Sequence, residues 1–226
     1  ERLRGQQLAR ISSELNNPNA IAGRTLMPLL FGSAHPYGMP PSGLGDPAVV
    51  AKVTREELAA FHSQWLRPDT ARIVVVGNTT MAVIVPLLEK SFGTWTAPAT
   101  PKPAKAFGVA TPAPKSRIVL VDRPKSPQSV ISAGQILAAK GRDDRVTLPA
   151  ENEILGGNFL SRINMDLRET KGWSYGVRGS IGLNVHAVPY LVNAPVQADK
   201  TGDSIKALNE QIVAIITTKG ITEEEI

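Results

Sequence analysis

Two side chains in the segment 155–177, Arg168 and Tyr175, have the chemistry needed to hold a peptide carbonyl. A guanidinium and a phenol both donate hydrogen bonds, which suit a carbonyl oxygen or the oxyanion that it becomes under attack. The segment is typical of a glycine turn, a helix that ends at Gly172 and a returning strand, so the two donors can meet. Spacing alone nevertheless favours a simpler interpretation, in which Arg168 pairs with a surface carboxylate and Tyr175 is half-buried core.

The other chemically capable residues form no catalytic motif in this sequence. There is no cysteine, which removes thiolate ligands and thiol nucleophiles. The three histidines, His35, His62 and His186, stand outside any H-x-x-E-H or H-E-x-x-H motif, and we expect His35 to hold a loop. No G-x-S-x-G pattern marks a serine nucleophile, and no phosphate-binding pattern surrounds Gly156-Gly157.

The composition is that of an ordinary globular protein. Of the 226 residues, 42% are hydrophobic and 20% are charged, which is enough to build one large domain or two modest ones. The net charge of +5 comes from scattered basic residues, so we expect no nucleic-acid partner. No apolar run approaches the roughly 18 residues that span a bilayer, so we expect no membrane partner either.

Hydrophobic periodicity predicts interleaved helices and strands, and therefore an α+β fold. Helices are predicted at residues 1–15, 20–30, 54–66, 81–92 and 201–218, with another starting near Asp143. The spacing of Phe159, Ile163 and Leu167 predicts one further helix, with these three side chains stacked on one face. Strands are predicted at residues 71–76, 117–121, 128–137, 173–181 and 190–196.

A proline-rich stretch divides the chain. Residues 96–116 contain five prolines among Ala, Thr and Lys, which predicts a stiff, extended linker. Residues 1–95 would then be the C-terminal part of one domain, and residues 117–226 a following domain that carries Arg168 and Tyr175 and is truncated at its end. The chain lacks an initiator Met, so we interpret it as a fragment of a longer protein.

The motif G-G-x-F-x-S-R-x-x-x-x-L-R-E-x-x-G-x-x-Y-G at residues 156–176 resembles the corresponding segment of the pitrilysin/insulinase-type zinc metallopeptidases, which include the mitochondrial processing peptidases. Similarity to this family extends over most of the chain. The supporting pieces are Phe31-Gly32 with His35-Pro36-Tyr37-Gly38, the helix after Thr54, Arg67-Pro68-Asp69-Thr70-Ala71, Val74-Val75-Val76-Gly77, residues 88–95, and residues 119–129.

The resemblance implies a fold and different roles for the two halves of the peptidase. Family members are built from repeated α+β domains of mixed, mostly antiparallel sheet packed against helices, and two halves enclose a chamber that admits unfolded peptides. One half holds zinc through H-x-x-E-H and a distal Glu, and the other contributes an Arg/Tyr pair that contacts the substrate. Arg168 and Tyr175 match that pair, and we expect Gly156 and Gly157 to belong to the same substrate-binding set.

One departure from the family pattern concerns the metal. The helix that begins with Glu1-Arg2 resembles the one that carries the distal zinc ligand, but Arg10 stands at the ligand position. Arginine cannot ligate zinc. Glu14 would serve only if the alignment slipped by one helical turn. We therefore expect no cofactor in this chain and zinc in the partner half.

The resulting hypothesis is a substrate-contacting, non-zinc half of a metallopeptidase that is inactive alone. Its partners would be a zinc-bearing half, fused in the same longer chain or separate, and a peptide substrate. Two alternatives stay open, namely an inert scaffold of the same fold and a module that binds extended peptides by strand addition. The compartment is open as well, with the periplasm favoured because many bacterial relatives are exported.

Overall fold

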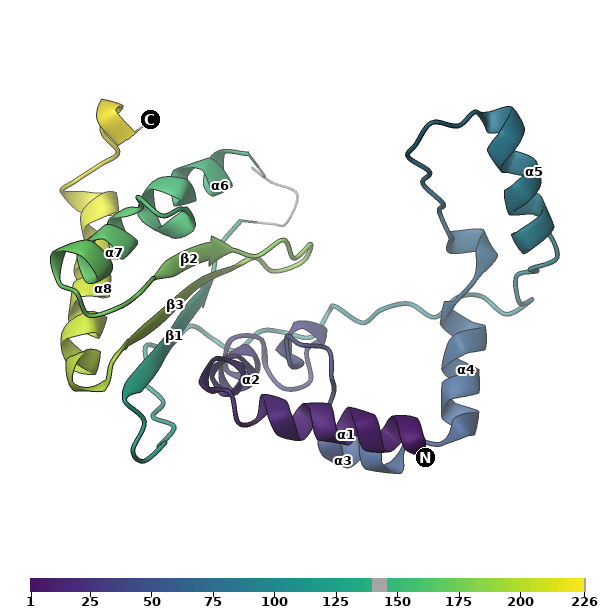
Figure 1. Cartoon of the computed structure of the whole chain (residues 1–226), viewed down its shortest axis with the longest axis horizontal. Coiled ribbons are helices and arrows are strands. Elements are labelled where there is room, and N and C mark those ends of the chain that lie inside the picture. Colours follow the sequence, from purple (N-terminus) through teal and green to yellow (C-terminus); the bar gives the residue numbers. More distant parts are fainter. Residues whose placement is uncertain (140–145, 226) are drawn as a thin grey trace. The chain divides into compact units, whose positions relative to one another are not determined.

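The computed structural model describes residues 1–139 and 146–225. The helix start predicted near Asp143 lies outside these residues. The chain forms two compact units, one made of Glu1–Asp46 with Phe107–Ile226 and the other of Pro47–Ala106 (Figure 1). The boundaries 1–95, 96–116 and 117–226 stay a prediction.

The centre of the first unit is a three-stranded antiparallel sheet. Its strands are β1 (Gln128–Ile136), β2 (Arg178–Ile181) and β3 (Pro189–Gln197), with β3 in the middle (Figure 1). The register pairs Gln128 with Gln197 at one end and Ile136 with Pro189 at the other. The α+β class predicted from the sequence is confirmed, as are the strands predicted at 128–137 and 190–196.

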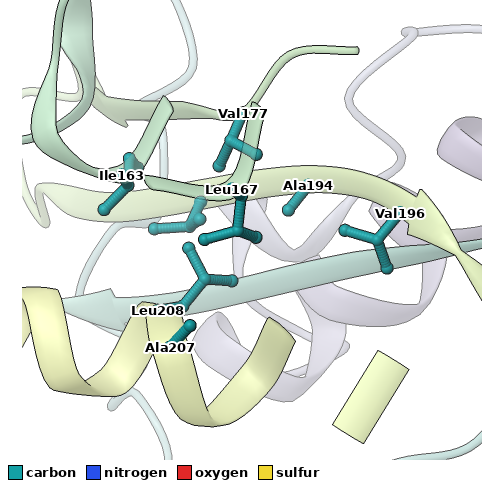
Figure 2. Close-up of a cluster of buried hydrophobic side chains, with 8 residues drawn as sticks. Ile163, Leu167, Val177, Ala194, Val196, Ala207 and Leu208 are labelled. Atoms are coloured by element: carbon teal, nitrogen blue, oxygen red, sulfur yellow. The ribbon is translucent and has the colours of Figure 1, made fainter. Parts of the chain in front are cut away.

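Helices cover both faces of this sheet. Val192, Ala194 and Val196 alternate along β3 and pack against Leu208 of α8 (Thr201–Thr217), while Figure 2 shows Leu167 meeting Leu208 in the same cluster. On the opposite face, α2 (Pro18–Phe31) lies against β1, where Gly134 leaves room for leucine side chains of that helix. Two buried faces fix the register, because a slip of one residue would expose this core.

The segment before Arg168 differs from the single helix predicted for it. The helix α6 (Thr147–Asn152) runs into the π-helical η3 (Glu153–Gly157), after which Asn158 is extended. The chain then forms the short α7 (Arg162–Asn164) and the π-helical η4 (Met165–Thr170), which Gly172 ends with a φ of 65°. The predicted stack is therefore wrong for Phe159, because the backbone at Ser161 is extended and separates Phe159 from the helix that carries Ile163.

The N-terminal helices are tied to the sheet unit by an aromatic cluster. The helix α1 (Arg2–Glu14) leads into α2, and the turn η1 (Pro36–Gly38) follows. The Nδ1 atom of His35 accepts a hydrogen bond from the Tyr37 N–H at 3.0 Å, so His35 holds this loop as predicted. The ring of Phe31 stacks on His35, and the Tyr37 hydroxyl accepts a hydrogen bond from the Val185 N–H in the β2–β3 loop.

The second unit consists of α3 (Pro47–Lys52), α4 (Arg55–Trp65), η2 (Pro68–Thr70) and α5 (Met81–Phe92). Thr54 and Glu57 form a reciprocal capping box at the start of α4. The buried Arg67 donates hydrogen bonds to the carbonyls of Thr100 at 2.6 Å and Pro98 at 3.1 Å. This clamp draws the segment after α5 back to the end of α4.

Two predicted strands do not form in the described chain. Residues 71–76 and 117–121 have no regular structure, and Val74 and Val76 are 84% and 93% exposed. A β-branched run becomes a strand only where a neighbouring strand accepts and donates its backbone hydrogen bonds. The remaining predicted strand, 173–181, is shorter than expected, because only β2 and one bridge between Ser174 and Val196 are paired.

Candidate functional site

Arg168 and Tyr175 both line one hollow of about 310 Å³ in the first unit. The hollow is also lined by Trp173, Ser174 and the paired sheet-end residues Gln128 and Gln197. All these side chains offer polar or aromatic contacts that suit a peptide backbone. The structure thus brings together the two site residues that the sequence singled out.

Arg168 is held by two neighbours. Its Cζ atom lies 4.2 Å from the centroid of the Phe159 ring, and its Nη1 atom lies 3.4 Å from Oε1 of Glu169. Nη1 is shielded from solvent, yet no atom of the described residues accepts a hydrogen bond from it. The guanidinium therefore has a surface carboxylate nearby, as the simpler interpretation expected, and still keeps a donor without an acceptor.

Tyr175 is not core. Its side chain is 89% exposed, which contradicts the half-buried position considered from spacing alone. The backbone around it is fixed, because the Ser174 hydroxyl donates to the Pro195 carbonyl at 2.5 Å and accepts from the Gly176 N–H at 3.1 Å. A large aromatic side chain thus projects into solvent from an anchored backbone, which leaves its hydroxyl available to a ligand.

The two glycines of the predicted set are buried. A Cβ on Gly156 would lie 2.7 Å from the Gly179 nitrogen and from Cδ1 of Ile163, and a Cβ on Gly157 would lie 2.6 Å from Oε1 of Glu153. Close packing of the η3 turn against the β2 backbone therefore requires Gly156, whereas the crowding at Gly157 comes from the Glu153 and Asn152 side chains that precede it. In the described chain neither lines the hollow, and their contact with substrate stays a prediction.

The sequence missed the polar residue that joins this region together. Asn164 is buried, and its side-chain amide bonds both the Phe159 carbonyl and the Val177 N–H. The sequence did carry an indication of this role, because Asn164 stands between the apolar Ile163 and Leu167 of a predicted helix. Asparagine is a poor helix former whose side chain competes for backbone hydrogen bonds.

The residues near the expected metal position do not fit a zinc site. Arg10 is exposed on α1, and the Glu14 carboxylate accepts a hydrogen bond from Nε of Arg24 at 3.0 Å. Hydrogen bonds from Ser42 and Arg24 hold the pKa of Glu14 below its usual value. Within residues 1–139 and 146–225, no three His, Asp or Glu side chains gather into a metal-binding group.

The helices of the described chain are too short or too polar to cross a membrane.

Comparison with known proteins agrees with the fold and the motif. Residues 52–226 match the family model described as the peptidase M16 inactive domain. An uncharacterized zinc protease of Mycobacterium bovis is 26% identical over 218 residues, which cover 96% of this chain and 49% of that protein. An uncharacterized zinc protease of Bacillus subtilis, YmxG, is 28% identical over 160 residues, which cover 71% of this chain and 37% of the relative. The chain thus spans about half the length, or less, of the curated relatives it matches.

Solved structures give the same result. The peptidase M16 inactive domain from Pseudomonas fluorescens superimposes with a TM-score of 0.85 at 26% identity, covering 99% of this chain and 52% of that one. The periplasmic protease PqqL from Escherichia coli shares the fold, with a TM-score of 0.67 at 19% identity over 99% of this chain and 24% of its own. The similarity to pitrilysin/insulinase-type peptidases expected from the sequence is confirmed: the chain belongs to the peptidase M16 family, in the part that the family model describes as the inactive domain.

Proposed function

We propose that this chain is the substrate-contacting half of a zinc metallopeptidase that cleaves peptides or unfolded polypeptides in a chamber formed with a zinc-bearing half. The match to an inactive domain and the zinc-protease names of relatives about twice as long support this division. The zinc-bearing half is part of the same longer chain or a separate subunit. No step of the chemistry is assigned to a metal in this chain, because Arg10 and the engaged Glu14 do not fit one.

Arg168 and Tyr175 would act on the peptide that crosses the hollow. The Arg168 guanidinium, which lines the hollow and is paired with Glu169, and the exposed Tyr175 hydroxyl can both donate to the carbonyl oxygen of a bound peptide. Their hydrogen bonds would strengthen as negative charge develops on that oxygen, and such donors stabilise the transition state more than the ground state. The supporting observation is that both side chains line one hollow and that the Tyr175 side chain is exposed there.

The test uses the assembled peptidase and two conservative variants. Tyr175→Phe keeps the ring and removes only the hydroxyl, while Arg168→Lys keeps the charge and loses the planar fork. Each should lower kcat by roughly tenfold to a thousandfold, as loss of an oxyanion donor typically does. The matched control is Tyr190→Phe, because the Tyr190 hydroxyl is buried beside β2 and lies outside the lining of the hollow.

The kinetic constants separate the alternatives. Unchanged kcat and KM in both variants would refute a role in catalysis and favour the inert scaffold. A rise in KM at constant kcat would instead assign the pair to peptide binding, because such an interaction is equally strong in ground state and transition state.

A further inference from the structure

Asn164 connects the loop that carries Phe159 with the backbone that follows Tyr175. It is the last residue of α7 and is only 3% exposed. Its Nδ2 atom donates to the Phe159 carbonyl at 2.6 Å, and its Oδ1 atom accepts from the Val177 N–H at 2.9 Å. A side chain of this size that donates and accepts at once is an amide, so neither aspartate nor leucine can replace both bonds.

The donated bond fixes the backbone under the Phe159 ring. Oδ1 of Asn158 accepts from the Leu160 N–H at 2.8 Å, so the loop is held on both sides of Phe159. The ring itself is 58% exposed and has little core packing to hold it. It nevertheless covers the Arg168 guanidinium, and a cation on an aromatic face has few favourable orientations. The Asn164 donor thus acts on Arg168 through Phe159.

The accepted bond fixes the backbone beside Tyr175. Val177 is buried in the core cluster, and its N–H is bonded to Asn164 rather than to a neighbouring strand. Gly176 passes close to the same oxygen, since a Cβ there would lie 3.9 Å from Oδ1. With Ser174 anchored to Pro195 on the other side, Tyr175 is held between two fixed points. The Asn164 acceptor thus acts on Tyr175.

We propose that Asn164 is a positioning residue that sets Arg168 and Tyr175 toward one peptide carbonyl. The proposal rests on the proposed function of these two side chains. Its specific content is that the two halves of one amide control different donors, with Nδ2 controlling Arg168 and Oδ1 controlling Tyr175. A purely structural asparagine would affect only the stability of the fold.

The variant Asn164→Asp separates the two halves. The carboxylate still accepts from the Val177 N–H but cannot donate to the Phe159 carbonyl. In the assembled peptidase we expect kcat/KM to fall about tenfold, within the range for a displaced donor. The fall should be smaller in an Arg168→Lys background, because the same donor is already impaired, and should be undiminished in a Tyr175→Phe background.

A spectroscopic signal tests the positioning without cleavage. The Arg168 guanidinium lies on the face of an aromatic ring, so the ring current should shift its Nε–H proton resonance upfield. Asn164→Asp should move this resonance toward its position in Phe159→Leu, a variant that removes the ring at an exposed site. If Asn164→Asp does not fold, the kcat/KM of Phe159→Leu tests the same connection between Asn164 and Arg168, because that connection runs through the Phe159 ring.

Asn152→Asp is the matched control. Asn152 is a buried asparagine at the end of α6, and its Nδ2 atom donates to the Gly179 carbonyl of β2 at 3.0 Å. The variant Asn152→Asp therefore loses the same kind of hydrogen bond at a different place. We expect Asn152→Asp to lower the melting temperature. The Arg168 resonance and the kcat/KM of the folded protein should stay unchanged.

The outcomes for the two proposals differ. An unmoved Arg168 resonance in Asn164→Asp, or a loss of kcat/KM equal to that in Asn152→Asp, would overturn the positioning role. A moved resonance together with cleavage that is insensitive to Arg168→Lys would support the positioning role and refute the proposed function.

Discussion

Glu225 closes the C-terminal segment onto Arg162 through two parallel hydrogen bonds. Nε of Arg162 donates to Oε1 at 2.6 Å and Nη2 donates to Oε2 at 2.5 Å. The same guanidinium donates to the carbonyls of Lys219 and Gly220, which follow α8. One side chain from α7 therefore ties down the end of the chain, and its fork geometry suits both the carboxylate and the two carbonyls.

This pair predicts an acid-sensitive C-terminal segment. The hydrogen bond from Arg162, together with bonds from Thr222, lowers the pKa of Glu225 to about 2. A carboxyl whose pKa is lower in the folded state stabilises the fold at pH above its unfolded pKa of roughly 4.3, and this contribution is lost as the pH falls toward 2. Glu225→Gln should therefore melt a few degrees below the wild type at pH 7, and the two melting curves should converge in acid. Glu224→Gln, in the same turn, should show no such convergence.

A buried hydroxyl makes the second prediction. The Tyr190 hydroxyl has no hydrogen-bond partner among the described residues, and burial raises the pKa of this phenol to about 12. Tyr190→Phe removes a buried polar group without leaving another one unpaired, so it should be neutral or stabilise the fold by about 1 kcal/mol in urea unfolding.

The same group gives an alkaline signature. Because the folded pKa is above the unfolded value of roughly 10, the stability of the wild type should fall as the pH rises from about 10 to about 12, while that of Tyr190→Phe should change less over this range. If Tyr190→Phe instead lowered the free energy of unfolding by more than about 1 kcal/mol at pH 7, the Tyr190 hydroxyl would have a hydrogen-bond partner in solution.

Much of the sheet unit was predictable, because its signals are local. The strands β1 and β3 and the helix α8 follow periods of 2 and 3.6, which the sequence displays directly. The strands predicted at 71–76 and 117–121 failed because strand formation depends on a distant partner, which composition does not report. The predicted helix through Phe159 failed for a related reason, since the extended backbone at the buried Ser161 separates Phe159 from Ile163, and periodicity does not report such tertiary packing.

In the candidate site, too, the features that depend on local sequence were predictable and those that depend on distant contacts were not. Arg168 and Tyr175 share one hollow because a glycine stop and a return toward β3 separate them, and both features are visible in the sequence. Asn164 escaped notice because its bonds reach residues 5 and 13 positions away. An amide that bridges two loops has no spacing rule, so only the folded arrangement identifies it.

The glycine-rich turn should tolerate no side chain at Gly156. A Cβ there meets the backbone nitrogen of Gly179, which cannot move without breaking the sheet edge. Gly156→Ala should therefore destabilise the fold by roughly 1–3 kcal/mol, as overpacking does. Gly202→Ala is the control, because Gly202 lies in α8 with nothing within 4 Å of its Cβ position. Alanine there should stabilise the helix by roughly 0.5–1 kcal/mol. Equal effects of the two changes on urea unfolding would contradict the packing role of Gly156.

Limited proteolysis tests the predicted linker and the clamp that holds its beginning. Residues 96–116 contain no helix or strand, and five prolines give them little reason to pack, so a protease should cut here first and leave a stable piece that begins near Arg117. Arg67 restrains part of this segment through the Pro98 and Thr100 carbonyls, and Asp69 fixes the orientation of its guanidinium through two further bonds.

The variant Arg67→Lys should therefore speed the first cut severalfold, because an ammonium cannot hold Asp69 and both carbonyls in the geometry of the guanidinium fork. When opening is fast relative to cleavage, the rate of the first cut should depend on the fraction of molecules in which this segment is open, rather than on global unfolding. Arg72→Lys provides a control at an exposed arginine five positions along the chain. A first cut within α8 would show that the segment 96–116 is not the weakest point, and an unchanged rate in Arg67→Lys would show that the clamp does not protect it.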